Sequence, residues 1–311
     1  MPRYAVIDVG TNSVKFHVGE AAADGRWTTV VDRAEVTRLG EGLAATGGEF
    51  SPSAMERTGA AIAAMAAEAK QAGAIAIAAV GTMGMRTARN SEAFIDEVAR
   101  RSDVRIEVIS GAEEGRLAYL AVKSGLGLGD GSLVIFDTGG GSSQFTFGRG
   151  ATVTEQFSVN VGAVRFTEQY GLGGVVSRAA LQRATDAIAA ELARLDGAQA
   201  PDALVGMGGA VTNLTAVMLA LATYDPDAVQ GARLSRAEVE RQIELYSSRS
   251  TEQRRQIVGL QPKRADVILA GACIVRTVMD KLQKYSLAVS DRGLRHGLLV
   301  DRFGKKPSTA S

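Results

Sequence analysis

The chain contains the same short pattern twice, and this repeat constrains its fold more than any other feature. The pattern is an apolar strand that ends in aspartate, a turn of small polar residues and a second strand with alternating apolar positions. The first copy covers residues 5–20, AVIDVGTNSVKFHVGE, and the second covers 133–148, LVIFDTGGGSSQFTFG. An offset of 129 positions aligns five pairs of identical residues: Asp8 with Asp137, Gly10 with Gly139, Ser13 with Ser142, Phe16 with Phe145 and Gly19 with Gly148. We therefore expect an internal duplication, with two domains that each contain one such unit.

Both turns have the composition of an anion-binding site. Small residues leave the backbone N–H groups open to an anion, because no bulky side chain intervenes. An aspartate beside such a turn would repel a phosphate unless a cation such as Mg²⁺ lies between them. Two ordinary β-hairpins would also have glycine-rich turns, but turn geometry alone gives no reason for an aspartate at the same place twice. The repeat predicts two phosphate-binding turns.

The composition is that of a globular protein with no bulk charge to attract a polyanion. Its 311 residues are enough for two domains, and 46% are apolar and 22% charged. The net charge of +1 excludes a whole-surface attraction to nucleic acid or membrane. Residues 60–80 are the most apolar long stretch, but charged residues and Gly73 interrupt them, which indicates a helix and a strand rather than a membrane span. With no signal peptide before the first strand, we expect a cytoplasmic location.

Cysteine and histidine give no indication of a metal site. Cys273 is the only cysteine, which excludes a disulfide framework and predicts a buried structural thiol. The two histidines, His17 and His296, have no ligand-type neighbours at useful spacing along the chain, so no histidine metal site is expected.

Strands and helices alternate around the two turns, as in an α/β protein. Residues 27–36 continue the first hairpin as a third strand, and a helix is predicted from the N-cap Ser51 to Gly73. The glycine-rich stretch 125–131 is the expected hinge between domains. Pro262 is predicted to open a long helix that ends near residue 285.

Two charged residues follow strands, where ligands gather in α/β proteins. Arg86 follows the strand at 74–80, and either a phosphate contact or a solvated surface arginine agrees with this position. Ser110 and Glu113 have capping-box spacing, so Glu113 is expected to reach back to the helix start. Glu114 has no such role and lies on the apolar side of the first turn. A partly desolvated carboxylate there suits a general base, and a glutamate that serves the helix dipole is the alternative.

Together, these motifs resemble the Ppx/GppA family, exopolyphosphatases and guanosine pentaphosphate phosphohydrolases of the actin/sugar-kinase/Hsp70 superfamily. The resemblance covers roughly residues 4–303. Its motifs are DVGTNS from Asp8, GMRTARN with Arg86, SGAEEGRL with Glu114, DTGGGSS from Asp137, NVGAVRFTE, VGMGGAVTNL, ADVILAG and SDRGLRHGLL.

The resemblance implies an α/β fold of two ribonuclease H-like domains flanking a cleft, with a polyphosphate chain between the two loops. Residues 1–124, completed by a last helix at about 291–303, would form the first domain. Residues 125–290 would form the second, and 304–311 would be a disordered tail. A homodimer is the expectation for this family.

The resemblance also implies a role for each site residue. Glu114 would activate the attacking water, Arg86 would stabilise the charge that develops in transfer, and Asp8 and Asp137 would bind Mg²⁺ or Mn²⁺. The implied phosphate-binding residues are Gly10, Thr11, Asn12, Ser13 and Lys15 in the first loop, Gly139, Gly140, Gly141, Ser142 and Ser143 in the second, and Gly208 and Gly209 at a strand–helix turn. Such a turn suits a phosphate at a helix N-terminus, although glycines also serve close packing.

The sequence departs from the family pattern in three places. Gln144, retained here as a candidate catalytic residue, replaces a glutamate implicated in metal binding and catalysis. Because a glutamine carbonyl can bind a cation but carries no charge and cannot act as a base, metal affinity should fall. His296 replaces a commonly acidic residue. The chain also lacks the C-terminal helical domains of longer relatives, which predicts lower processivity.

The function predicted from these residues is a Mg²⁺-dependent phosphohydrolase. Its substrate would be inorganic polyphosphate or pppGpp, from which it would release terminal orthophosphate. A sensor that binds polyphosphate or (p)ppGpp but hydrolyses it poorly is the main alternative, because of Gln144. A kinase of the same superfamily is a third, although no adenosine pocket can be identified. Aromatic residues are only 5% of the chain, and the choice between the two substrates stays open.

Overall fold

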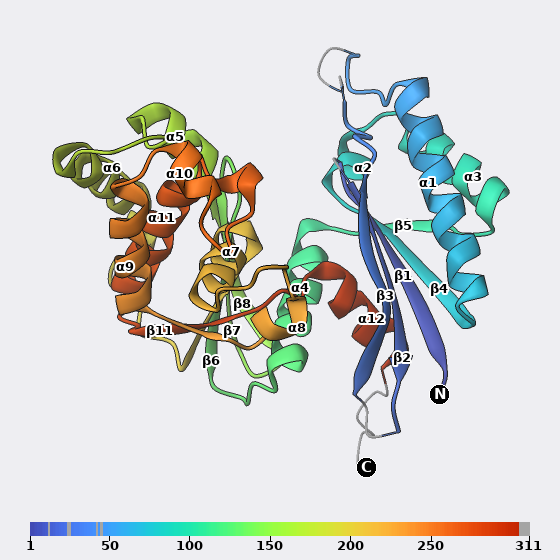
Figure 1. Cartoon of the computed structure of the whole chain (residues 1–311). Helices are drawn as coiled ribbons and strands as arrows, with labels where there is room; N and C mark the ends of the chain where they lie inside the picture. Colours follow the sequence, from blue (N-terminus) through green and yellow to red (C-terminus); the bar gives the residue numbers. More distant parts are fainter. Residues whose placement is uncertain (12, 24–25, 42, 44–45, 305–311) are drawn as a thin grey trace. The chain divides into compact units, whose positions relative to one another are not determined.

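The structure is a computed structural model that describes residues 1–11, 13–23, 26–41, 43 and 46–304. The chain forms two compact units (Figure 1). The first unit is Met1–Ala121 with Gly293–Ser311, and the second is Val122–Arg292. The sequence predicted that the two points where the chain passes from one domain to the other lie after residues 124 and 290. Asn12 and all of the predicted tail except Gly304 lie outside the described residues.

The first unit is built on a five-stranded sheet in the order β3-β2-β1-β4-β5. Neighbours are antiparallel from β3 to β1 and parallel from β1 to β5. The strands are β1 (Arg3–Val9), β2 (Ser13–Ala21), β3 (Trp27–Val36), β4 (Ala74–Gly81) and β5 (Ile106–Val108). The helices are α1 (Pro52–Gln71), α2 (Met83–Thr87), α3 (Ser91–Ser102), α4 (Gly111–Leu126) and α12 (Leu294–Phe303).

Both faces of this sheet are covered, which explains the continuous apolar run in β1. Side chains alternate across a strand, so Ala5, Ile7 and Val9 join the core beneath α1 and α3. Val6 points to the other face, into a second core that includes Leu298 of α12. Helix α12 packs on β1 and β2 although it comes from the far end of the chain.

The second unit is built on a six-stranded sheet in the order β10-β11-β9-β6-β7-β8. Its strands are β6 (Ser132–Thr138), β7 (Ser143–Arg149), β8 (Thr152–Val159), β9 (Ala203–Met207), β10 (Arg233–Ser235) and β11 (Ser286–Val289). Its helices are α5 (Ala163–Tyr170), α6 (Arg178–Glu191), α7 (Gly208–Met218), α8 (Pro226–Val229), α9 (Arg236–Ser247), α10 (Thr251–Arg255) and α11 (Ile268–Lys281), with short 3-10 turns at Ala193–Leu195 and Pro262–Arg264. Helix α11 is the buried centre of this unit and packs on α5, α6, α7 and α9.

The two sheets share one topology, which confirms the predicted pair of ribonuclease H-like folds. In each unit an antiparallel meander (β1-β2-β3 or β6-β7-β8) continues into parallel strands on the side of its first strand. The β1–β2 and β6–β7 hairpins are the two copies of the sequence repeat. Each repeat therefore occupies the same place in its own sheet.

Three local predictions differ from the structure. Helix α4 continues through Leu126, so Gly125 is helical and the division between units falls inside this helix rather than in a glycine-rich hinge. Pro262 opens only a 3-10 turn, and α11 begins at Ile268. The hydroxyl of Ser110 accepts the N–H of Glu113 at 3.1 Å, but the Glu113 carboxylate bonds Arg116 instead of the helix start.

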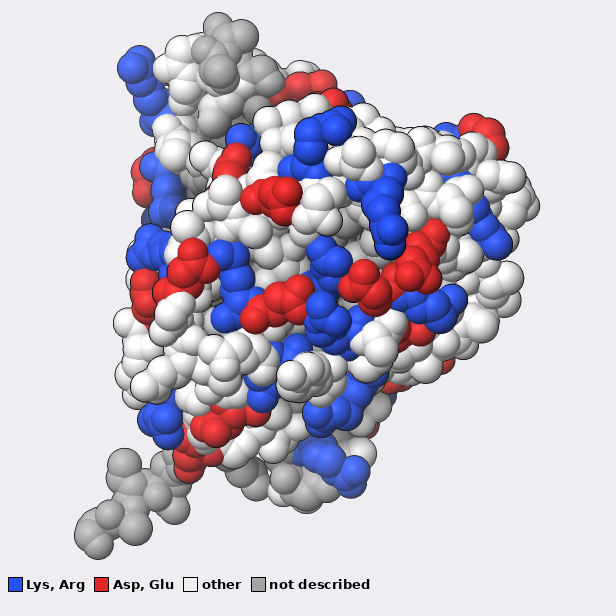
Figure 2. Space-filling view, turned by 90° about the vertical axis from the view of Figure 1, so that its left-hand side faces the viewer, with Lys and Arg blue, Asp and Glu red and all other residues white. Residues whose placement is uncertain are grey.

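The distribution of charged side chains on the surface is consistent with the low net charge of the chain. On the face shown in Figure 2, basic and acidic side chains alternate, and neither sign forms a continuous field. Among the described residues, none of the helices combines the length and the hydropathy that a membrane crossing requires.

Candidate functional site

The loop between β1 and β2 places an aspartate beside a tight turn. The N–H of Gly10 donates to the carbonyl of Ser13 at 3.0 Å, and a Cβ at Gly10 would lie only 2.9 Å from that oxygen. Asp8 lies two residues before Gly10 and is 3% exposed. Burial raises the pKa of Asp8 in spite of Lys15, whose Nζ lies 3.4 Å from Oδ2 and lowers it. Lys15 therefore balances a buried carboxylate at the edge of the predicted phosphate loop.

The first loop is fixed by glycines from two other segments. The carbonyl of Thr11 accepts the N–H of Gly40 at 2.8 Å. A Cβ at Gly84 would lie 2.9 Å from the Thr11 hydroxyl. Thr11 itself is exposed, so its backbone is both accessible and held in place.

Arg86 and Glu114 form an ion pair from two different helices of the first unit. The Arg86 guanidinium donates to the carbonyl of Ile109 at 2.7 Å and to Oε2 of Glu114 at 3.2 and 3.3 Å. Arg86 is an exposed residue, but its guanidinium is held by the Ile109 carbonyl and the Glu114 carboxylate. The Glu114 side chain is 39% exposed, so its carboxylate is less desolvated than its position on the apolar side predicted. A phosphate that reaches this arginine would meet Glu114 at the same place.

The loop between β6 and β7 repeats the geometry of the first. The N–H of Gly139 donates to the carbonyl of Ser142 at 2.9 Å, which is the Gly10–Ser13 bond displaced by 129 residues. Residues 139–141 are exposed. The carbonyl of Gly140 accepts the N–H groups of Val164 and Arg165 at 2.9 and 3.1 Å, which ties the loop to the start of α5. The exposed backbone is therefore held rigidly, as an anion-binding turn requires.

The first two residues of β7 have different environments. Ser143 is fully buried, and its hydroxyl donates to the carbonyl of Val161 at 2.6 Å, so this hydroxyl serves the fold rather than a ligand. Gln144 is exposed and lies directly across from Asp137 in the β6–β7 pairing, as Lys15 lies across from Asp8. The side chain that faces the loop aspartate is thus a cation in one unit and a neutral amide in the other.

The strand–helix turn after β9 forms a cradle for Asp137. Gly208 has a φ of +79°, and a Cβ there would lie 2.0 Å from Oδ1 of Asp137. Helix α7 begins at Gly208 and has no side-chain cap at its start. Any larger residue at 208 would displace the carboxylate, so this glycine is required for packing and for access to Asp137. Asp8 and Asp137 each offer hard oxygen donors of the kind that Mg²⁺ prefers, and the absence of a side chain at Gly208 leaves room for the Asp137 carboxylate.

Sequence reasoning missed one residue of this site, Arg264. Its guanidinium covers Gly209, because a Cβ at Gly209 would lie 2.1 Å from its Cζ. Within the described part of the chain, no hydrogen bond or ion pair engages this guanidinium. Asn213 on α7 positions the segment, since its Oδ1 accepts the N–H of Gln261 at 2.9 Å. A cation placed at a helix N-terminus without a carboxylate partner is suited to an anion. The only sequence signal was the ADVILAG motif that follows it.

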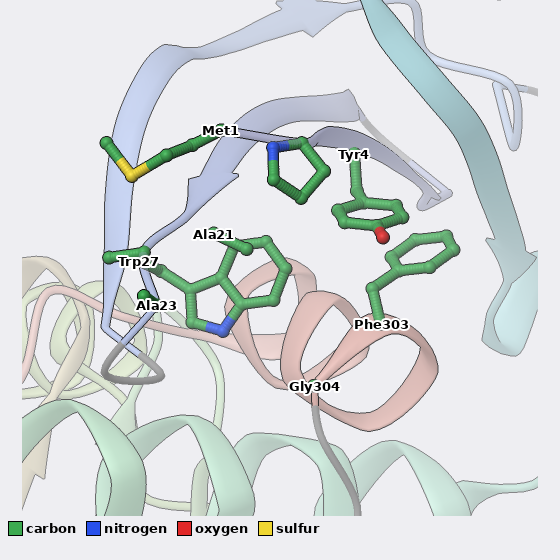
Figure 3. Close-up of a pocket in the computed structure, with 9 residues that line it drawn as sticks. Met1, Tyr4, Ala21, Ala23, Trp27, Phe303 and Gly304 are labelled. Carbon is green, nitrogen blue, oxygen red and sulfur yellow. The ribbon is translucent and has the colours of Figure 1, made fainter.

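One apolar pocket in the first unit contains none of the predicted site residues. It has a volume of about 320 Å³ and is lined by Tyr4, Trp27 and Phe303 among others (Figure 3). Tyr4 lies near the start of β1, whereas Asp8 lies near the end of the same strand. The pocket is therefore separate from the phosphate loop. Cys273, predicted to be a structural thiol, is fully buried in the second unit, and burial raises its pKa to about 11.

Comparisons with known proteins agree with this geometry. The model of the Ppx/GppA phosphatase family matches residues 18–306. Exopolyphosphatase 2 of Mycobacterium tuberculosis is 29% identical over 330 residues, which cover 98% of this chain and 99% of that protein. Exopolyphosphatase 1 of Mycobacterium leprae is 28% identical over 97% of this chain and 89% of its own length. The crystal structure of the type II variant of the Aquifex aeolicus Ppx/GppA phosphatase superposes with a TM-score of 0.91 at 30% identity, covering 97% of this chain and 100% of that one.

Proposed function

Because the chain belongs to the Ppx/GppA phosphatase family, we propose that it releases terminal orthophosphate from inorganic polyphosphate. The observation that carries the proposal is the pair of loops, each closed by the same hydrogen bond and each beside an aspartate. Two phosphate-binding turns in one chain suit a substrate with several linked phosphates. The names of the two mycobacterial relatives support polyphosphate as that substrate.

In the proposed reaction, the N–H groups of Gly140, Gly141 and Thr11 bind phosphoryl oxygens, while the N–H of Gly139 closes the second loop. Glu114 accepts a proton from a water molecule, whose oxygen forms a bond to the terminal phosphorus. The bond from that phosphorus to the bridging oxygen breaks, and the shortened polyphosphate leaves with the electron pair. Arg86, which bonds Glu114, stabilises the charge on the transferred group.

Asp8 and Asp137 are the carboxylates that would hold Mg²⁺ or Mn²⁺, which when bound neutralises charge on the phosphoryl oxygens. Gln144 lies across from Asp137 and adds an uncharged oxygen there. Weak binding of the cation is expected as a result. Arg264, beside Gly209, adds a positive charge to the second loop's side of the site.

A second candidate is a sensor that binds polyphosphate or (p)ppGpp and turns it over slowly. Gln144 is the observation that favours it, since an amide cannot replace a carboxylate as a base or a charged ligand. The intact Arg86–Glu114 pair favours the hydrolase.

The test is orthophosphate release from medium-chain polyphosphate and from pppGpp, with and without Mg²⁺, at low and high salt. We expect Mg²⁺-dependent release, faster from polyphosphate, with an affinity that falls steeply with salt as for other polyanions. Gln144→Glu should lower the Mg²⁺ concentration needed for half-maximal rate. Faster release from pppGpp would contradict the substrate assignment. Binding of either ligand without release, restored to turnover by Gln144→Glu, would identify the sensor instead.

A further inference from the structure

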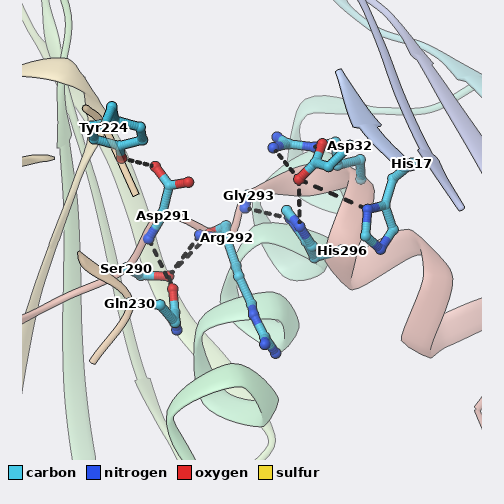
Figure 4. Close-up of polar contacts among 10 residues, drawn as sticks. His17, Asp32, Tyr224, Gln230, Ser290, Asp291, Arg292, Gly293 and His296 are labelled. Atoms are coloured by element: carbon cyan, nitrogen blue, oxygen red, sulfur yellow. Dashed lines mark hydrogen bonds and ion pairs between the residues drawn. The ribbon is translucent and has the colours of Figure 1, made fainter. Parts of the chain in front are cut away.

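The two histidines of the chain meet at one carboxylate in the first unit (Figure 4). His17 comes from β2, Asp32 from β3 and His296 from α12. The two imidazole rings lie 4.6 Å apart between centroids. Nε2 of His296 lies 3.3 Å from Oδ2 of Asp32, and Nδ1 of His17 lies 3.8 Å from the same oxygen. Spacing along the chain gave no indication of this cluster, because it does not show contacts between the two ends of a unit.

A metal ion is the first candidate for such a cluster, since one ligand atom from each side chain lies within 4.8 Å of the others. Two contacts oppose it. Arg295 bonds both oxygens of Asp32, at 2.7 and 2.9 Å, which neutralises the carboxylate. Nδ1 of His296 accepts the N–H of Gly293 at 3.2 Å, so the neutral ring carries its proton on Nε2, the atom that faces Asp32. These contacts describe an imidazole that donates to a carboxylate.

His296 is also the cap of its own helix. It is the third residue of α12, and it accepts the N–H of Gly293, the residue that precedes the helix. An N–H at a helix start has no partner within the helix, so this acceptor stabilises the first turn. Protonation would place a hydrogen on Nδ1, opposite another donor. It would also add a positive charge in the first turn, where the helix dipole disfavours it.

The carboxylate that faces the His296 ring is shared with Arg295, so its negative charge is already compensated in part. The charged and titratable groups that face the cluster are Asp8 from β1, Lys15 and His17 from β2, Asp32 from β3 and Arg295 from α12. Asp8 pairs with Lys15, and Asp32 pairs with Arg295. Burial raises the pKa of Asp32, but hydrogen bonds from His296 and Arg295 outweigh it and hold that pKa well below its usual range. Only the histidines are then expected to change charge between pH 5 and 8.

The capped residue lies where the chain returns to the first unit. Asp291, two residues earlier and in the second unit, is held by groups that do not titrate near neutral pH. Its N–H donates to Oε1 of Gln230 at 2.9 Å, and its carboxylate accepts the hydroxyl of Tyr224 at 2.7 Å (Figure 4). Gly293, in contrast, depends on His296. One end of this connecting segment is therefore sensitive to protons and the other is not.

We propose that His296 is a proton-sensitive cap that fixes the start of α12 at neutral pH and releases it in acid. The sign follows from proton binding. The released state binds one more proton than the capped state, so the capped state gains stability with rising pH and loses it as pH falls through the ordinary range of histidine, about 6.5. For one proton and a released-state pKa of about 6.5, the opening equilibrium of this turn increases about fivefold between pH 6.5 and 5.5.

The test is hydrogen exchange at the backbone of residues 293–297, followed by mass spectrometry from pH 5.5 to 8 and corrected for intrinsic rates. In the wild-type protein, protection of this segment should fall about fivefold from pH 6.5 to 5.5. Residues of α11 serve as the internal reference and should not change. His296→Gln keeps an acceptor for the Gly293 N–H but cannot ionise, so its protection should be independent of pH.

Three results would overturn the proposal. The first is a pH-independent wild-type segment, and the second is an unchanged pH dependence in His296→Gln. The third is a large gain in protection with equimolar Zn²⁺ that His17→Gln and His296→Gln both abolish, since this identifies a metal site. If His296→Gln does not fold, the NMR titration of the two histidine Cε1–H signals in the wild-type protein decides, and His296 must then resist protonation more than an exposed histidine.

Discussion

Arg264 shows how a single side chain can complete a site that glycines only outline. Its guanidinium lies against Gly209 at the start of α7, and Gly208 next to it accommodates the Asp137 carboxylate. Position 209 must be glycine because the Arg264 guanidinium occupies the space that a side chain there would need. The combination places one cation and one anion at the same helix end, as expected for a site that binds phosphate together with a metal ion.

Replacing this arginine should weaken substrate binding more than it slows chemistry. Arg264→Gln removes the charge, and we expect the KM for polyphosphate to rise about tenfold at low salt, in line with about 1.4 kcal/mol for one charge-assisted contact. Arg165→Gln is the control, because Arg165 bonds Glu191 at 2.9 Å and is already paired. Steady-state orthophosphate release measures both. Equal KM values for the two variants would remove Arg264 from the site.

At the residue scale, the sequence predicted site residues that lie in recognisable motifs and missed those that only tertiary packing brings together. Asp8 and Asp137 were identified because the same residue recurs in the same pattern. Arg264 and Asp32 reach their partners only through tertiary packing, and no local periodicity indicates such contacts. The resemblance implied a phosphate contact at the backbone N–H of Ser143, which stays a prediction. Nothing in the sequence indicated that the hydroxyl of this residue bonds the carbonyl of Val161.

Among the elements of the second unit, α10 has an unusual anchor. Arg254 is fully buried, and its guanidinium donates to the carbonyls of Tyr246, Leu172 and Ala265 at 2.9, 2.9 and 3.3 Å. It also bonds the carbonyl of Gly174. Backbone carbonyls that lose a buried donor are costly to leave unsatisfied. This arginine therefore joins segments distant in sequence, including the turn before α11.

Arg254→Met should destabilise the protein by about 3 kcal/mol, because buried carbonyls lose their donor while the apolar volume is retained. Arg255→Met is the matched control. Arg255 is next to Arg254 in the sequence, but its side chain is 44% exposed and pairs with Glu252. Its replacement should therefore change the free energy of unfolding by less than about 0.5 kcal/mol. Urea denaturation followed by circular dichroism measures the free energy of unfolding. Similar losses in both variants would show that the buried network contributes little.

Helix boundaries were the least predictable feature of the elements. The glycines of residues 125–131 indicated a hinge, yet α4 continues to Leu126. The Gly125 carbonyl accepts a hydrogen bond from Gln230 at 3.4 Å, and Gln230 comes from a distant part of the chain. A tertiary contact of this kind supports the last turn against the low helix propensity of glycine.

For the whole molecule, the architecture followed from the repeat, because two equal hairpins imply two equal sheets. The last helix is different. Helix α12 completes the first unit from the opposite end of the chain, and it was expected there only through the family resemblance. Its return path is also where the proposed proton-sensitive cap acts, so the least local part of the fold carries the proposed pH response.

The most direct test of the account is Glu114→Gln, with orthophosphate release and polyphosphate binding measured on the same protein. Loss of the base should slow release at least about a hundredfold, while the dissociation constant changes less than about threefold. Glu113→Gln is the control, because this neighbouring carboxylate bonds Arg116 at 2.8 Å and should keep nearly full activity. A Glu114→Gln protein as active as the wild type would contradict the account, and so would a wild-type protein that binds polyphosphate and releases no phosphate.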